Sequence, residues 1–172
     1  MRFLIIISGT PGSGKSELAK ELSLLINTSL IHLSSYIKQH DLAEGYDKAR
    51  KSLIVDTTLL TAHLRPDIEK ARNGNKSLIV EGHLAHTLPS SLFDCCLITR
   101  CNPSVLKLRL AKRKYHAAKI QENIDCENFD LCGNEAREAG YKTFNIDTTQ
   151  ITPRTAAREA LKQLSTLNIP QK

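Results

Sequence analysis

The feature that most constrains this chain is a glycine-rich segment of eight residues near its amino terminus. Residues 9–16 read Gly-Thr-Pro-Gly-Ser-Gly-Lys-Ser and fit the pattern G-x-x-x-x-G-K-[ST] at every required position. The apolar run Phe3–Ile7 precedes the segment. Leucines with the spacing of an amphipathic helix follow it, at Leu18, Leu22 and Leu25. A strand, a tight turn and a helix in this order predict an α/β fold.

The chemistry that such a turn supports is phosphate binding. Glycines allow the backbone to wrap around a phosphate with its N–H groups pointing inward, and the following helix start adds partial positive charge. Lys15 would contact the β- and γ-phosphates of a nucleoside triphosphate, and the Ser16 hydroxyl would be a ligand of Mg²⁺. The alternative is a turn that only joins a strand to a helix. The complete spacing and the flanking elements favour a phosphate-binding loop (P-loop).

Short apolar runs alternate along the rest of the chain with longer helical patterns. We expect strands at Arg2–Ser8, Ser29–His32, Ser77–Glu81, Cys95–Arg100 and Thr143–Asp147. This alternation predicts a three-layer α/β fold, with helices on both faces of a central five-stranded parallel sheet. No internal repeat or linker composition divides the 172 residues, so residues 1–172 are interpreted as a single domain.

Two of the predicted helices are marked by their first residues. Asn102-Pro103 and Thr152-Pro153 each pair an N-cap residue with a proline at the first helical position. The apolar spacing predicts a long helix from about Ser52 to Arg72. The region Tyr115–Gly140 is expected to be helical with a break near Cys132–Asn134, where glycine and asparagine interrupt the pattern.

A P-loop needs a second acid to position the magnesium ion. The third predicted strand ends in Glu81, where aspartate is commoner, and the extra methylene changes the reach of the carboxylate. The alternative role for Glu81 is a cap at the strand end. Asp56 is the other candidate acid, and we interpret it as a surface or capping residue because it lies in a helical pattern.

Two histidines follow this acid on the same loop. His83 lies two residues beyond Glu81 and could orient a water or an acceptor group, or act as an acid or base. The alternative for His83 is a solvated loop histidine without a catalytic role. We prefer the solvated interpretation for His86.

The net charge of +6 is concentrated in one stretch of the chain. Residues 95–121 hold seven basic side chains and no acid, so the remainder is close to neutral. These side chains are Arg100, Lys107, Arg109, Lys112, Arg113, Lys114 and Lys119. Arg109 and Arg113 share a helix face, and such cations can neutralise the charge on a transferring phosphoryl group. A solvated basic face and an RNA-contacting patch are the alternatives.

Composition excludes several classes of protein. The chain is 41% hydrophobic and 24% charged, as globular chains are, and unlike disordered or collagen-like ones. Its longest apolar run, Phe3–Ile7, is far shorter than the ~20 residues of a membrane span, so we expect no membrane association. We expect a cytoplasmic location because the run does not read as an export signal. The five cysteines form no C-x-x-C pair and are interpreted as small buried hydrophobes.

The order of these motifs resembles the adenylate kinase isoenzyme 6 family of P-loop nucleoside monophosphate kinases, whose members also act in maturation of the small ribosomal subunit. The likeness runs from about Arg2 to Leu164. Besides the P-loop and the histidine beyond the strand acid, it is carried by Gly45-Tyr46-Asp47, Leu108-x-Leu110-x-x-Arg113-x-Tyr115, Lys119, Glu122-Asn123-Ile124 and Cys126-Glu127. Glu81–His86 and Ile146–Thr149 are similar to archaeal members.

The resemblance implies a fold of the nucleoside monophosphate kinase type with a short lid at about residues 112–122. It implies an acceptor-binding segment at about residues 32–55, with Ser35 and Lys38 as substrate-binding residues, and an adenine-side loop at Asp147–Thr149. The ATP contacts that it implies are Gly12, Ser13, Gly14, Lys15, Ser16, Glu17 and Arg113. The position of His83 matches the family's histidine that is linked to ATP hydrolysis.

The acceptor side departs from the pattern of ordinary adenylate kinases. Those enzymes follow the third strand with an arginine that grips the acceptor phosphate, whereas Glu81-Gly82-His83-Leu84 contains none. Lys38 stands where an arginine would bind a phosphate through two nitrogens, which lysine cannot do. We therefore expect weak or unusual binding of the acceptor.

The leading hypothesis is phosphoryl transfer from MgATP to a nucleoside monophosphate, AMP, with ATP hydrolysis when no acceptor is bound. Ser16 and Glu81 would hold Mg²⁺, and His83 would position the nucleophile. The catalytic cations would be Lys15, Arg109 and Arg113. The resemblance also implies a small-subunit ribosomal protein as partner, with contact to rRNA left open, and we expect a monomer. The alternatives are an ATP-driven assembly factor with incidental kinase activity, and a P-loop kinase of a small metabolite.

Overall fold

The core of the structure is a five-stranded parallel sheet. The computed structural model describes residues 2–47 and 52–167. The strand order is β2-β5-β1-β6-β7, and each strand runs parallel to its neighbours. The strands are β1 (Leu4–Gly9), β2 (Ser29–His32), β5 (Leu78–Glu81), β6 (Cys95–Arg100) and β7 (Thr143–Asp147). The five predicted strands are confirmed, with small shifts at their ends.

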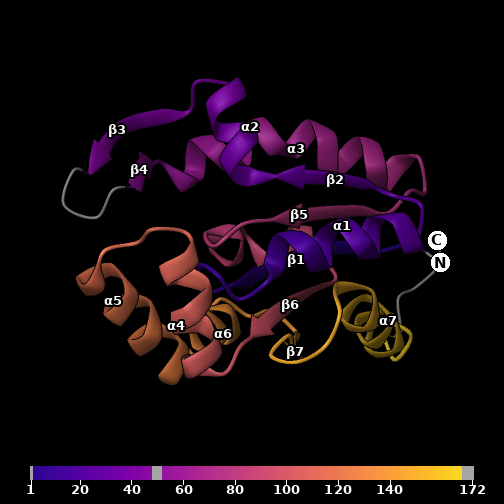
Figure 1. The fold of residues 1–172 in the computed structure, drawn as a ribbon. Helices are drawn as coiled ribbons and strands as arrows, with labels where there is room; N and C mark the ends of the chain where they lie inside the picture. The colour runs from indigo at the N-terminus through magenta and orange to yellow at the C-terminus, as the bar shows by residue number, and fades with distance from the viewer. Residues whose placement is uncertain (1, 48–51, 168–172) are drawn as a thin grey trace.

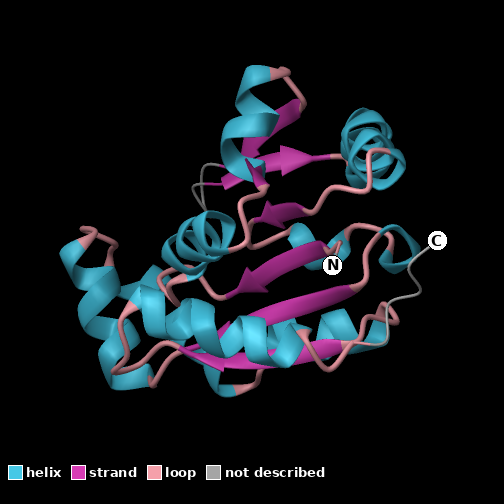
Figure 2. Cartoon of the chain, turned by 90° about the vertical axis from the view of Figure 1, so that its right-hand side faces the viewer, coloured by secondary structure: helices cyan, strands magenta, loops and turns pink. Residues whose placement is uncertain are grey.

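Helices cover both faces of this sheet (Figures 1 and 2). Successive residues of β1 point to opposite faces, so Ile5 and Ile7 join one hydrophobic core while Leu4 and Ile6 join the other. The first core is closed by α1 (Lys15–Leu25) and α7 (Pro153–Leu164). The second is closed by α2 (Leu33–Gln39), α3 (Thr57–Asn73) and α6 (Leu131–Glu138). The three-layer α/β prediction is confirmed.

Two smaller units flank the carboxyl ends of the strands. Figure 1 shows the hairpin of β3 (Ala43–Asp47) and β4 (Ser52–Val55) on one side, and α4 (Pro103–Lys112) with α5 (Ala117–Asn128) on the other. Two short 3₁₀ turns, η1 (Ala85–Thr87) and η2 (Ser90–Leu92), connect β5 to β6. Among the described residues, no helix is long and apolar enough to cross a membrane.

The long helix expected from Ser52 begins later, so that part of the prediction is wrong. Residues 52–55 form β4, which pairs antiparallel with β3, and α3 starts at Thr57. Leu53 and Val55 pack against the core from the hairpin, and this burial outweighs their local helical spacing. Asp56 caps α3 by accepting hydrogen bonds from the N–H groups of Thr58 and Leu59, which confirms its interpretation as a capping residue.

The helical break expected near Cys132–Asn134 is also misplaced. The chain turns at Phe129–Asp130, where Asp130 adopts a left-handed conformation with φ 48°, and α6 begins at Leu131. Gly133 lies inside α6, where the Asp130 carboxylate packs over this first turn against the glycine. The glycine that suggested a break therefore continues the helix, in close contact with the Asp130 side chain.

We expect Asp56→Ala to lower the free energy of unfolding by about 1 kcal/mol, because the first turn of α3 loses its side-chain acceptor. Chemical denaturation measures the change. Asp56→Asn is the control, since asparagine retains an acceptor oxygen and should cost much less. Equal losses for the two variants would contradict the capping role.

Candidate functional site

The P-loop joins β1 to α1 at the carboxyl edge of the sheet. Gly14 is the N-cap residue of α1 and adopts a left-handed conformation with φ 92°. Gly12 also has a positive φ of 89°, and a Cβ atom there would lie 2.9 Å from Leu110 Cδ2. Both glycines are thus favoured by backbone conformation, and Gly12 also by its close contact with α4. The backbone N–H groups of such a loop form a cradle for phosphate.

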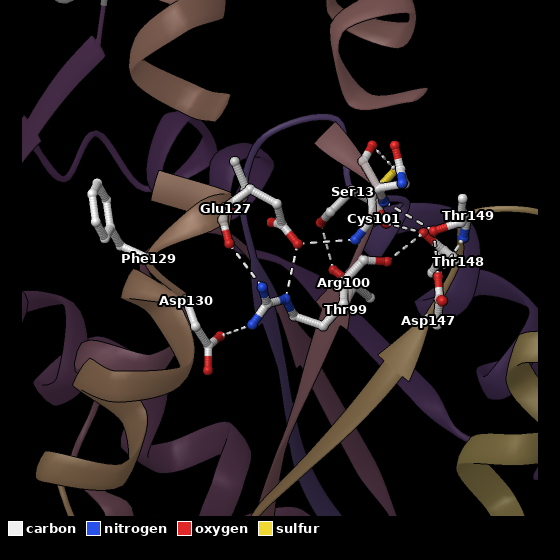
Figure 3. Close-up of polar contacts among 12 residues, drawn as sticks. Ser13, Thr99, Arg100, Cys101, Glu127, Phe129, Asp130, Asp147, Thr148 and Thr149 are labelled. Atoms are coloured by element: carbon white, nitrogen blue, oxygen red, sulfur yellow. Dashed lines mark hydrogen bonds and ion pairs between the residues drawn. The ribbon is translucent and has the colours of Figure 1, made fainter. Parts of the chain in front are cut away.

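The loop is anchored from beneath by buried hydroxyl groups (Figure 3). Ser13 Oγ lies 2.5 Å from Thr99 Oγ1 on β6, and both side chains are fully buried. Thr148, just beyond β7, donates from Oγ1 to the Ser13 carbonyl oxygen at 2.6 Å. The Ser13 side chain therefore points into the protein, and contact of this residue with ATP would be made by its backbone.

The side chain of Lys15 lies inside the P-loop. Its side chain is buried, and Nζ donates a hydrogen bond to the carbonyl oxygen of Thr10 at 3.0 Å. Burial lowers the pKa of Lys15 to about 8, the nearby carboxylate of Glu81 opposes this shift, and the charge of Arg113 adds to it. An incoming phosphate would give this desolvated ammonium group a stronger acceptor than the loop carbonyl.

Glu81 lies beside the P-loop helix, as the sequence predicts. It ends β5, is 5% exposed, and accepts a hydrogen bond from Ser16 Oγ at 3.2 Å through Oε1. Ser16 and Glu17 are exposed on the first turn of α1. A hydroxyl and a carboxylate oxygen are the hard ligands that Mg²⁺ prefers, so the pair fits that ion.

His32 begins the expected acceptor segment, but its contact with Glu81 was not predicted from the sequence. It ends β2, pairs in register with Glu81, and places Nδ1 2.8 Å from the second carboxylate oxygen, Oε2. The available signal was a polar residue at the end of a strand, on the same sheet edge as Glu81. His32 holds one oxygen of the acid and leaves the other directed to Ser16.

The two loop histidines have different environments. His83 is exposed, but surrounding protein atoms desolvate its ring and, with the charge of Lys15, lower its pKa to about 4. The ring is therefore neutral near pH 7 and able to accept a hydrogen bond. The solvated interpretation of His86 is wrong: its side chain is 4% exposed and lies between Ser8 and Glu135, because η1 turns it inward.

The basic stretch divides into groups with separate roles. Arg100 forms ion pairs with Glu127 and Asp130, so its charge is neutralised within the protein (Figure 3). Arg109 donates to the carbonyl oxygens of Thr148 at 2.7 Å and Thr149 at 3.4 Å, which holds it against the loop after β7. The exposed residues of this stretch include Lys107, Lys112, Arg113 and Lys114. Of these four residues, Arg113 is the one whose charge lowers the pKa of Lys15.

A cavity opens beside the loop that follows β7. Its volume is about 340 Å³, and its lining includes Arg100, Asn102, Glu127, Asp147 and Thr149. The loop expected near the adenine thus borders an open space. On the opposite side of the sheet edge, Ser35 and Lys38 are exposed on α2. Part of the expected acceptor segment, residues 48–51, lies outside the described residues.

The cysteine prediction is confirmed for three residues and wrong for two. Cys95, Cys96 and Cys101 are buried, as expected of small hydrophobes. Cys126 and Cys132 are only partly buried because they lie on α5 and α6, outside the sheet core. Desolvation raises the pKa of Cys132 to about 11, so its thiol is protonated near pH 7.

We expect Thr148→Val to raise the dissociation constant for ATP about 3- to 10-fold, because the Ser13 carbonyl loses its hydrogen bond and the P-loop loses an anchor. Calorimetric titration with ATP measures the change. Thr166→Val is the control, since this hydroxyl bonds only locally to Gln163, far along the chain from the loop. Unchanged affinity in Thr148→Val would contradict the anchoring role.

Comparisons with known proteins agree with this geometry. The family model described as AAA domain matches residues 5–130. A Methanosarcina acetivorans protein named "Putative adenylate kinase" is 36% identical, over 95% of this chain and 87% of its own length. "Adenylate kinase isoenzyme 6 homolog FAP7" of Saccharomyces cerevisiae is 39% identical, over 78% of this chain and 66% of its own length.

The similarity to solved structures concerns the fold. A shikimate kinase from Acinetobacter baumannii, in complex with shikimate, superposes with a TM-score of 0.70 at 15% identity, over 99% of this chain and 97% of the other. The three-layer P-loop kinase fold is therefore shared even where the sequences have diverged. Taken with the P-loop geometry and the identities to its relatives, this places the chain in the adenylate kinase isoenzyme 6 family of P-loop proteins.

Proposed function

We propose that this protein transfers the γ-phosphoryl group of ATP to a nucleoside monophosphate, AMP, and hydrolyses ATP when no acceptor is bound. The observation that carries the proposal is the meeting of Lys15 with the Ser16–Glu81 pair at one sheet edge, with the charge of Arg113 acting on the same lysine. Relatives named as adenylate kinases support the choice of acceptor. We place the protein in the cytoplasm as a monomer.

The residues act by positioning and by electrostatics. The P-loop N–H groups and Lys15 bind the β- and γ-phosphates, and Arg113 stabilises negative charge on the transferring group. Ser16 and Glu81 would hold Mg²⁺, which supplies charge neutralisation at the phosphate oxygens when bound. His83, neutral near pH 7, orients the nucleophile by accepting its hydrogen.

Arg109 contributes from the nucleotide side. Its guanidinium donates hydrogen bonds to the carbonyl groups of Thr148 and Thr149. These bonds fix its orientation next to the loop that we assign to the adenine. Arginine planes stack well on aromatic bases. Arg109 therefore serves catalysis by orienting ATP, and Arg113 is the arginine assigned to the phosphates.

The acceptor would bind between α2 and the β3–β4 hairpin. Ser35 and Lys38 are exposed on α2 and are the acceptor-binding side chains in this proposal. His32 is the first residue of the acceptor segment, and its ring contacts the carboxylate of Glu81. The acceptor segment is therefore in direct contact with the acid proposed to bind Mg²⁺. Lysine offers a single charged nitrogen to a phosphate, which predicts a weakly held acceptor.

A second candidate is an ATP-driven assembly factor that acts on a small-subunit ribosomal protein or on rRNA. The exposed basic side chains of Lys107, Lys112 and Lys114 favour an anionic surface such as RNA. The fold shared with shikimate kinase keeps a small-metabolite kinase as a third candidate.

A coupled assay across AMP, GMP, CMP and UMP discriminates these candidates. With MgATP present, we expect AMP to raise ATP turnover by more than about 10-fold over hydrolysis alone, since the transfer site is complete only with acceptor bound. Stimulation by RNA or by a ribosomal protein, without response to AMP, would favour the assembly factor. Transfer to a shikimate-like alcohol alone would favour the metabolite kinase.

We expect Lys15→Ala to reduce phosphoryl transfer by roughly 100-fold or more, because the charge on the γ-phosphoryl group loses its buried ammonium partner. Steady-state kinetics with MgATP and AMP measures the loss. Lys20→Ala is the matched control, since Lys20 is exposed on the same helix. Full activity in Lys15→Ala would overturn the proposed function.

A further inference from the structure

We propose that His86 is a positioning residue that orients the Glu81–His83 segment through Ser8; this inference rests on the phosphoryl-transfer function proposed above. The side chain of His86 is buried in the turn η1. Its Nδ1 lies 2.7 Å from Ser8 Oγ, and its Nε2 lies 2.7 Å from Glu135 Oε2 on α6. Both ring nitrogens are thus engaged by partners from different parts of the fold.

The polar partners of His86 form a chain of contacts that runs from Glu135 to His83. A carboxylate only accepts hydrogen bonds, so Nε2 carries the hydrogen and donates to Glu135. At the other ring nitrogen, Nδ1, the hydroxyl of Ser8 completes the contact. The same hydroxyl also lies 3.3 Å from the carbonyl oxygen of His83, to which it can donate.

Ser8 occupies a place where this chain of contacts can affect the site. It is fully buried at the end of β1 and immediately precedes the first P-loop glycine, Gly9. Its neighbour Ile7 pairs in register with Glu81. His86 therefore connects the start of the P-loop, the turn that carries His83, and α6. The anchoring of Glu135 on α6 holds the ring in the orientation that Ser8 requires.

The consequence is catalytic alignment. Glu81 and His83 must both face the transferring phosphoryl group, and they belong to one short segment that leaves β5. A displacement of about 1 Å in such a segment can cost as much as 100-fold in rate. The ring of His86 contacts Ser8 and Glu135, whereas Lys15 donates to Thr10, so the loss of His86 should affect turnover more than affinity for ATP.

Two substitutions of His86 distinguish the contact of Nδ1 with Ser8 from the contact of Nε2 with Glu135. The amide of asparagine reaches about as far as Nδ1 and can retain the bond to Ser8, whereas the longer glutamine reaches toward Glu135 as Nε2 does. We expect His86→Gln to lower kcat about 10-fold with KM for ATP changed by less than about 2-fold, while His86→Asn keeps kcat within about 3-fold of wild type. The assay uses the full chain with MgATP and AMP.

Ser8→Ala tests the same link from its other end. It should lower kcat about as much as His86→Gln does, and the double variant should show little further loss, because both changes break one connection. Ser8→Ala also keeps the test informative if the histidine variants fold poorly. Tyr141→Phe is the control, since it removes a buried hydrogen bond to Leu88 near the same turn without touching Ser8.

The outcomes separate this inference from the proposed function. Equal kcat values in His86→Gln, His86→Asn and wild type would overturn the positioning role, as would losses that only follow the folded fraction measured by circular dichroism. So would a loss of kcat in Tyr141→Phe as large as that in His86→Gln. A wild-type chain that neither transfers phosphoryl groups nor hydrolyses ATP would overturn the proposed function, and this inference with it.

Discussion

The parallel pairing of β1 between β5 and β6 is the constraint on which the rest of the structure depends. All six residues of β1 are buried, and its backbone groups are satisfied by a neighbour on each side. Because parallel strands end at the same edge, this arrangement brings the P-loop, Glu81 and the start of α4 together. A loop that leaves so firmly held a strand can present its N–H groups in a fixed arrangement, which phosphate binding requires.

Buried hydroxyl groups and ion pairs then decide which charges reach a substrate. Thr99 and Thr148 fasten the P-loop to β6 and β7, and hydroxyls suit this purpose because they satisfy buried carbonyl groups without adding charge. Arg100 is neutralised by Glu127 and Asp130, and Arg109 is held by carbonyl groups. The strongly basic stretch of the sequence therefore offers fewer free cations than its composition indicates, and Arg113 is the one assigned to the site.

Much of the fold was predictable because its signals are local. The five strands, the P-loop and the proline-marked starts of α4 and α7 follow from spacing within a few residues. The failures arose where distant contacts outweighed a local pattern. Residues 52–55 form a strand because β3 pairs with them, and the chain turns at Asp130, whose carboxylate pairs with Arg100, rather than at Gly133. The buried position of His86 and the contact of His32 with Glu81 had no local signal of comparable strength.

The sequence by itself determined that the chain is a three-layer P-loop protein, and it predicted that Lys15, Ser16 and Glu81 lie together at one sheet edge, since both conclusions depend on short motifs and on strand ends. The tertiary structure alone decided how that site is supported. The supporting hydrogen bonds join residues 49 positions apart, as in His86 and Glu135, or 135 positions apart, as in Ser13 and Thr148. Such pairs meet only because the order of strands in the sheet brings them together, and no spacing along the chain encodes that order.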